Sequence, residues 1–169
     1  MQIGVVDYGA SNIFSVLRAV SHLGAKAKVI SKQEDLKSID KIILPGQGSM
    51  GACIENLKKK NLFESLKLSL SEKPYLGICL GLQVLFSLSE ESIDSEGMNI
   101  FSGKVERFTE NENFKIPHMG WNQVVFKKKH FVNNLKTLNC LRFFFFSATT
   151  KSICEMVSIC ICLLYTSPS

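Results

Sequence analysis

Short apolar segments alternate with segments of helical periodicity through the first half of the chain, and this alternation limits the possible folds more than any other feature. Four segments have the length and composition of buried strands: QIGVV (2–6), AKVI (27–30), KIIL (41–44) and YLGI (75–78). Between them, apolar residues recur at helical spacing in 13–23, and a Leu- and Lys-rich stretch, 53–70, predicts one or two further helices. This order predicts crossover connections and therefore an α/β fold: a doubly wound, mostly parallel sheet with helices on both faces.

Three loops follow predicted strands and would lie together at the carboxyl edge of this sheet. They are Asp7–Asn12, Pro45–Gly51 and the turn at Cys79. Ser11 or Asn12 can cap the start of the first helix, and Gly24 can end it. Because open α/β sheets bind ligands at the carboxyl ends of their strands, we expect the functional site among these loops.

The length and composition are typical of one globular domain, and they indicate neither a nucleic-acid-binding protein nor a secreted one. The 169 residues carry 20 Lys and Arg against 15 Asp and Glu, a formal net charge of +5, and two Lys triplets (58–60 and 127–129) hold much of the excess. No aromatic platform or recognition motif accompanies the triplets, so we expect solvated faces and no nucleic-acid partner. No basic region followed by a long apolar run opens the sequence, so we expect no signal peptide, no membrane partner and a cytoplasmic location.

The last part of the chain differs in character from the rest. Residues 137–169 contain only three charged side chains and carry the segments FFFF and CICLLYTSPS. The apolar stretch 153–165 is shorter than the ~20 residues of a membrane span, and a thiolate metal site at Cys154, Cys160 and Cys162 would lack a second matched pair. We therefore predict a partial domain over 1–136 and an aberrant tail over 137–169, produced by a frameshift or by read-through.

Cys79 stands between two glycines at the end of the fourth predicted strand. The segment Gly77-Ile78-Cys79-Leu80-Gly81 has the form of a G-x-S-x-G nucleophile elbow with sulfur in place of oxygen. Such a sharp strand-to-helix turn strains its central residue and requires very small neighbours. A helix beginning at Leu80 (LGLQVLFSL, 80–88) would direct free N–H groups at the sulfur and favour the reactive thiolate. The alternative is a structural cysteine buried at a strand end.

A glycine-rich loop follows the third predicted strand. The segment Gly46-Gln47-Gly48-Ser49-Met50-Gly51 matches G-x-G-x-x-G, which is a dinucleotide fingerprint when it opens the first βα unit with an acidic residue about twenty positions later. Here the loop is deep in the chain and position 71 is Ser. The other interpretations are a plain glycine turn, or half of an oxyanion hole that would act with the N–H of Leu80 on a tetrahedral intermediate.

Four segments together resemble one family closely: Asp7-Tyr8-Gly9-Ala10-Ser11-Asn12, Leu44-Pro45-Gly46-Gln47-Gly48, Gly77-Ile78-Cys79-Leu80-Gly81-Leu82-Gln83 and Pro117-His118-Met119-Gly120-Trp121-Asn122. They are similar to the glutamine amidotransferase subunit of imidazole glycerol phosphate synthase, a class I, triad-type glutaminase of histidine biosynthesis. The resemblance covers about residues 1–130. GICLGLQ is typical of any class I amidotransferase, whereas DYGASN and PHMGWN narrow the resemblance to this subunit.

The resemblance implies a function for each matching position. Cys79 would attack the side-chain amide of glutamine, form a γ-glutamyl thioester and release ammonia, while the backbone N–H groups of Leu80 and Gln47 would bind the oxyanion. Residues expected to hold the glutamine are Gly46, Gly48 and Gln83. A cyclase subunit with a β/α barrel would be the heterodimer partner and would receive the ammonia; residues expected to face it are Asn12, His118, Met119, Trp121 and Asn122. Neither a metal ion nor an organic cofactor is implied.

The sequence departs from the family in one serious respect. The catalytic base of the family is a histidine in a C-terminal His-Pro-Glu motif, and this sequence contains no such motif. Of its three histidines, His22 is expected on the polar side of a helix, His118 in the partner-facing segment and His130 on a surface loop. The alternatives to an active synthase subunit are therefore another class I amidotransferase, or a truncated fragment with an incomplete sheet that only binds the cyclase. We expect Cys79 to react weakly with glutamine-like electrophiles unless an intact C-terminus is restored.

Overall fold

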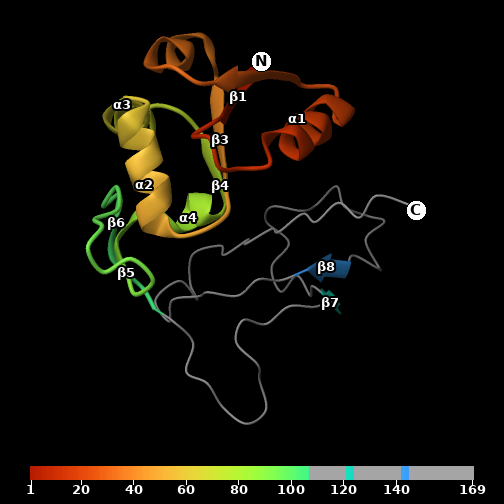
Figure 1. Ribbon diagram of the computed structural model, residues 1–169. Coiled ribbons are helices and arrows are strands. Elements are labelled where there is room, and N and C mark those ends of the chain that lie inside the picture. Colours follow the sequence, from red (N-terminus) through yellow and green to blue (C-terminus); the bar gives the residue numbers. More distant parts are fainter. Residues whose placement is uncertain (107–120, 124–141, 145–169) are drawn as a thin grey trace.

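The computed structural model describes residues 1–106, 121–123 and 142–144 (Figure 1). The strands are β1 (Gln2–Val6), β2 (Lys26–Ile30), β3 (Lys41–Gly46), β4 (Tyr75–Cys79), β5 (Phe86–Ser89), β6 (Phe101–Val105), β7 (Trp121–Gln123) and β8 (Arg142–Phe144). The α-helices are α1 (Ile13–His22), α2 (Met50–Lys59), α3 (Phe63–Ser69) and the single turn α4 (Leu80–Gln83), and a 3₁₀ helix, η1, spans Gln33–Ser38.

The first four strands form one parallel sheet in the order β2-β1-β3-β4. The chain therefore leaves β1 toward one edge, and after β2 it crosses back to the other side of β1. This reversal makes a topological switch point between the carboxyl ends of β1 and β3, where open α/β sheets bind ligands. At the end of the β3–β4 ladder, Gly46 pairs with Cys79.

Helices cover both faces of this sheet, as the alternation in the sequence predicts (Figure 1). On β3, Ile42 and Leu44 join a core cluster that includes the apolar side of α2, whereas Ile43 joins a second cluster formed with α1. The two-residue period of the strand thus supplies both cores. In α2, the buried residues Met50, Cys53, Ile54 and Leu57 recur at helical spacing and form one stripe against the sheet.

Most of the predicted elements are confirmed. The stretch 53–70 contains two helices, α2 and α3, and the side chain of Asn12 caps α1 by accepting a hydrogen bond from the N–H of Ser15 at 3.3 Å. Gly24 follows the end of α1 with φ +74°, a left-handed conformation that favours glycine. The short helix η1 has no counterpart in the sequence-based expectations.

The prediction of a helix over 80–88 is wrong. The helix α4 ends at Gln83, and β5 begins at Phe86. Beyond α4 the N–H of Met98 donates to the carbonyl of Val84 at 2.7 Å, and the N–H groups of Ile100 and Phe101 both donate to Leu85 at 2.9 and 3.0 Å. These long-range bonds take the carbonyls that a continued helix would need, so tertiary pairing overrides the helical periodicity of this segment.

Two smaller pairs of strands complete the described structure. β5 pairs with β6 in parallel with an irregularity between Phe86 and Leu88, and β7 pairs with β8 in an antiparallel register of three residues. The predicted domain boundary between residues 136 and 137 and most of the predicted tail lie outside the described residues.

Candidate active site

The end of β4 has the backbone geometry of a nucleophile elbow. Cys79 is the last residue of β4 and the residue that precedes α4, and it adopts φ 55° and ψ −110°. A non-glycine residue with positive φ is costly, and such strain concentrates at functional sites. The side chain of Cys79 is partly exposed at the carboxyl edge of the sheet. The elbow predicted from the sequence is therefore present, and the alternative of a fully buried structural cysteine does not describe Cys79.

Glycine is required at three positions around the elbow because backbone segments approach each other closely there. A β-carbon on Gly77 would lie 2.5 Å from the carbonyl oxygen of Gly81, and one on Gly81 would lie 1.9 Å from the carbonyl oxygen of Leu44. A β-carbon on Gly46 would lie 2.6 Å from the β-carbon of Leu80. α4 therefore packs directly on the ends of β3 and β4, which brings the Gly46 loop beside Cys79.

Tyr8 holds the loop that follows β3. The N–H of Gln47 donates to the Tyr8 hydroxyl at 3.1 Å, and the hydroxyl donates to the Gln47 carbonyl at 3.4 Å. This contact joins the loops after β1 and β3 across the switch point of the sheet. The predicted role of Gln47 as an oxyanion donor would require its N–H to exchange the phenol for the oxyanion.

The second cysteine close to the site has a different character. Cys53 on α2 is 1% exposed, and burial raises the pKa of its thiol to about 12. Tyr8 contacts this thiol, and burial holds the pKa of the Tyr8 hydroxyl well above its usual range. Both groups are therefore neutral at physiological pH, so Cys53 is a core residue and Tyr8 cannot serve as a general base.

Two further residues predicted to hold glutamine lie next to the elbow. Gln83 ends α4, four residues after Cys79, and is 9% exposed. Within the described part of the chain its side-chain oxygen has no hydrogen-bond partner. A buried amide oxygen in this state is an acceptor available to a ligand that carries N–H groups. Gly48 has φ +95°, a conformation that favours glycine, and nothing lies within 4 Å of the position that a β-carbon would take there.

Lys60 fixes the loop that follows β1. Its ammonium group donates to the carbonyl of Asp7 at 2.8 Å and lies 3.4 Å from the Asp7 carboxylate. The other carboxylate oxygen accepts the N–H of Gly9 at 2.8 Å. In the first Lys triplet, Lys59 pairs with Glu55 at 2.6 Å and Lys58 lies 5.2 Å from the ring centre of Phe63. Each lysine of that triplet therefore has a contact within the chain.

The residues predicted to face a partner are only partly described. Asn12 is exposed at the start of α1, and Phe14, two residues later, is 72% exposed. Trp121 and Asn122 belong to β7, where Trp121 pairs with Phe144 and Asn122 with Phe143. His118 and Met119 lie outside the described residues.

A model of the class I glutamine amidotransferase family matches residues 4–159, which include both sides of the site. The chain belongs to the class I glutamine amidotransferase family. Among its relatives, imidazole glycerol phosphate synthase subunit HisH of Synechococcus sp. (strain CC9902) is 47% identical over 122 residues, which are 72% of this chain and 57% of that protein. The protein of the same name from Cyanophora paradoxa is 43% identical over 125 residues, 73% of this chain and 58% of its own length. The amidotransferase chain thus spans about three-fifths of these relatives.

A solved structure shares the fold of this amidotransferase. The crystal structure of a glutamine amidotransferase superposes with a TM-score of 0.57 at 19% identity, covering 71% of this chain and 62% of that chain. At this identity the similarity establishes the fold only. It confirms the prediction of an amidotransferase-like parallel sheet with helices on both faces.

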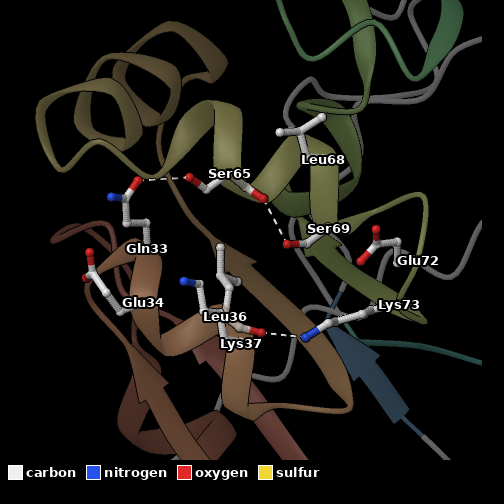
Figure 2. A pocket seen from close by; sticks show the side chains of 9 residues that line it. All are labelled: Gln33, Glu34, Leu36, Lys37, Ser65, Leu68, Ser69, Glu72 and Lys73. Carbon is white, nitrogen blue, oxygen red and sulfur yellow. Dashed lines mark hydrogen bonds between the residues drawn. The ribbon is translucent and has the colours of Figure 1, made fainter.

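A groove of about 410 Å³ lies away from the elbow, between η1 and α3 (Figure 2). Its lining includes Leu36, Lys37 and Lys73, and the Lys73 ammonium donates to the carbonyls of Leu36 at 2.5 Å and Ile39 at 2.8 Å. Lys73 precedes β4 whereas Cys79 ends it. At ~3.3 Å per residue the strand separates the two by roughly 20 Å. The groove is therefore not part of the amidotransferase site.

Two negative observations concern the described residues alone. Among them, no group of three or more His, Cys, Asp or Glu could hold a metal ion. None of the helices in these ranges combines the length and apolar composition needed to cross a membrane.

Sequence reasoning missed the side chains that support the site from below. Tyr8 and Lys60 contact the loops after β3 and β1, and the hydroxyl of Tyr75 donates to the carbonyl of Gly81 at 2.5 Å. Each of these contacts except the last joins segments distant in sequence, so local patterns carry no signal for them. The one sequence signal is the tyrosine in the otherwise apolar strand YLGI. A buried tyrosine hydroxyl usually has a hydrogen-bond partner, so its presence there could have indicated such a bond.

Proposed function

We propose that this chain is the glutaminase subunit of imidazole glycerol phosphate synthase, which hydrolyses glutamine at Cys79 and passes the ammonia to a cyclase subunit. The observation that carries the proposal is the strained conformation of Cys79 between glycines, at φ 55° and ψ −110°, in a class I amidotransferase chain. The relatives from Synechococcus and Cyanophora paradoxa both bear the name of this synthase subunit, which favours it over another class I amidotransferase.

The chemistry begins with attack of the Cys79 thiolate on the side-chain amide carbon of glutamine. The carbonyl oxygen becomes an oxyanion that accepts a hydrogen bond from the N–H of Leu80, and a second one from the N–H of Gln47 once that group leaves Tyr8. The C–N bond then breaks, the nitrogen takes a proton and leaves as ammonia, and a γ-glutamyl thioester remains on Cys79. Water hydrolyses the thioester to glutamate and restores the thiol. Gly46, Gly48 and the buried amide of Gln83 would hold the amino-acid part of the substrate.

The proton acceptor is the part of the mechanism that the described residues do not supply. Their one histidine is His22, which is exposed at the last residue of α1. Because α1 runs back from the carboxyl edge, its last residue lies at the end of the sheet opposite to Cys79. The expectation of a solvated His22 is confirmed, and His118 and His130 lie outside the described residues.

The partner would dock on the carboxyl edge of the sheet. Asn12 begins α1 at this edge, and Phe14 beside it exposes 72% of its surface. An exposed aromatic side chain next to a polar loop is typical of a protein interface. We propose that this end of α1 contacts the barrel-shaped cyclase subunit in a heterodimer in the cytoplasm, together with His118, Met119, Trp121 and Asn122.

The experiment is a measurement of ammonia release from glutamine by the purified chain mixed with a cyclase subunit of the synthase. Wild type should release ammonia slowly, because the His-Pro-Glu motif is missing, and Cys79→Ser should remove the activity above background while leaving binding to the cyclase unchanged. Cys53→Ala is the matched control, because it removes a buried thiol from α2 and leaves Cys79 in place. Equal rates for wild type and Cys79→Ser would contradict the proposal.

A second measurement tests the dependence on a base. The alkylation rate of Cys79 by a glutamine-like electrophile is compared by mass spectrometry between this chain and a version that carries a His-Pro-Glu motif from a relative. Faster labelling of the extended version is expected. Equal labelling would refute the dependence on that motif, and resequencing beyond codon 130 would test whether the predicted tail 137–169 arises from a shifted frame.

A further inference from the structure

Helix α4 is only one turn long, so it leaves a backbone carbonyl that needs a donor. The N–H of Val84 donates to Leu80 at 3.1 Å, and the N–H of Leu85 donates to Leu82 at 3.2 Å. Neither N–H bonds to the carbonyl of Gly81, the residue that lies between Leu80 and Leu82 in the sequence. Gly81 is buried, so water does not readily supply a partner.

The hydroxyl of Tyr75 supplies this missing donor. It donates to the Gly81 carbonyl at 2.5 Å, and burial raises the pKa of Tyr75 well above its ordinary value, so that the phenol keeps its proton. Tyr75 opens β4 and Cys79 ends it. The contact therefore joins the start of the strand to the helix that follows the nucleophile.

The geometry of β4 makes this contact possible. Tyr75, Gly77 and Cys79 alternate with Leu76 and Ile78 and so share one face of the strand. α4 folds back over that face, and Gly77 admits it because a β-carbon there would lie 2.7 Å from the N–H nitrogen of Leu82. The phenol of Tyr75 reaches past Gly77 along the same face and meets the turn from below.

We propose that Tyr75 is a positioning residue for the amidotransferase nucleophile, and that its hydroxyl holds α4 against β4 and so keeps Cys79 in its strained conformation. A residue at φ 55° persists only when its surroundings fix it. Cys79 is fixed on one side by the pairing of Gly46 in β3, and on the other by the first turn of α4. Removal of the Tyr75 hydroxyl leaves that turn with an unsatisfied buried carbonyl, so the turn opens more often and the strain at Cys79 relaxes.

This inference about Tyr75 rests on the proposed role of Cys79. Two independent measurements distinguish an error about Tyr75 from an error about Cys79. The variant is Tyr75→Phe in the full chain, which keeps the ring and removes only the hydroxyl. The matched control is Ser69→Ala in α3, because the Ser69 hydroxyl also donates to a backbone carbonyl, that of Ser65, at 2.8 Å. The first readout is amide hydrogen exchange of residues 80–85. The second is the reaction of Cys79 with the glutamine analogue 6-diazo-5-oxo-norleucine, resolved into the inactivation rate constant and the half-saturating concentration.

Tyr75→Phe should speed exchange in residues 80–85 by about tenfold, corresponding to the loss of one hydrogen bond to a buried group. The inactivation rate constant of the labelled fraction should fall by about tenfold, with the half-saturating concentration unchanged within twofold. Ser69→Ala should change neither quantity. A purely structural role would lower the labelled fraction and leave the rate constant of the folded protein unchanged.

Unchanged exchange in Tyr75→Phe would overturn the inference, as would faster exchange with an unchanged inactivation rate constant. If Cys79 fails to react with the analogue in the presence of the cyclase even in the version that carries a His-Pro-Glu motif, the proposed function fails. In that case the exchange measurement still decides the structural half of the inference: faster exchange supports a Tyr75 contact that holds the turn, and unchanged exchange refutes it.

Discussion

The backbone N–H of Gln47 donates to the hydroxyl of Tyr8 at 3.1 Å, although 39 residues separate the two in the sequence. Tyr8 follows β1 and Gln47 follows β3, so the contact closes the switch point of the sheet on the side of Cys79. The Tyr8 hydroxyl thus accepts the hydrogen bond of the same Gln47 N–H that the proposed oxyanion hole requires.

This competition predicts a gain of activity in Tyr8→Phe. Without the hydroxyl, the Gln47 N–H no longer gives up a hydrogen bond when it turns to the oxyanion, and a net cost of about 1 kcal/mol disappears. Glutamine hydrolysis or labelling of Cys79 by a glutamine analogue should therefore rise about fivefold. Because damage to the fold can only slow the reaction, a gain is diagnostic. The prediction would be contradicted if Tyr8→Phe had the same urea midpoint as wild type but reacted more slowly. Tyr8 would then be a residue that positions the loop for the reaction.

Because α4 lies so close to β3, we predict that the Gly81→Ala variant cannot form the elbow around Cys79. The new methyl group would lie 1.9 Å from the Leu44 carbonyl oxygen, so the elbow must move apart, at a cost of about 3 kcal/mol or more. Urea unfolding gives the loss of stability and the glutamine analogue gives the loss of Cys79 labelling. Gly24→Ala is the matched control. It lies at φ +74° with nothing within 4 Å, so it should cost only about 1 kcal/mol and leave labelling intact.

The exposed start of α1 predicts the effect of Phe14→Asp on partner binding. Phe14 is 72% exposed in this chain, so a charge there should leave the fold unchanged but should weaken binding to the cyclase subunit by tenfold or more, on the order of 1.4 kcal/mol. Titration calorimetry measures the affinity. Leu23→Asp serves for comparison, because Leu23 is 82% exposed at the other end of the same helix and should have no effect. Equal weakening by both variants would argue against an interface at the start of α1.

The raised pKa of Cys53 predicts a loss of stability in alkaline solution. The thiol titrates near 9.0 in an unfolded chain and at about 12 in the folded protein, so above pH 9 only the unfolded state releases this proton. The contribution is therefore complete below pH 9 and is lost as the pH rises toward 12, by about 1.4 kcal/mol at pH 10. Urea unfolding of wild type and Cys53→Ala at pH 8 and pH 10 measures it. The stability advantage of wild type over the variant should shrink at pH 10, and a constant difference would refute the assignment.

The parts of the fold that follow from local pattern could be predicted from the sequence. The apolar run KIIL predicts β3, and the periodicity of Ile13 to Leu23 predicts α1, because burial on one or both faces dictates those patterns. The segment LGLQVLFSL shows the limit of this reasoning. Its helical spacing is real, but the carbonyls of Val84 and Leu85 bond to residues 98–101, which no local window contains.

The same division holds for the candidate site. Cys79 and its glycines are contiguous in sequence, so the elbow could be predicted from spacing. Tyr8 and Lys60 act through side-chain contacts with segments that the order of the strands brings close, whereas Tyr75 reaches Gly81 across the elbow itself. The motif therefore predicts where the sulfur is, whereas only the assembled sheet reveals what holds the loops around it.

The strand order β2-β1-β3-β4 also makes the bend at Cys79 a product of two strands that are distant in sequence. Within the described sheet β4 lies at the edge beside β3, and Gly46 at the end of β3 pairs with Cys79. A peptide that contained β4 and α4 without β3 would lack both this pairing and the close approach of Gly81 to the Leu44 carbonyl. We therefore expect the cysteine of such an isolated peptide to behave as an ordinary thiol, because a neighbouring strand contributes to its presentation as much as its own motif does.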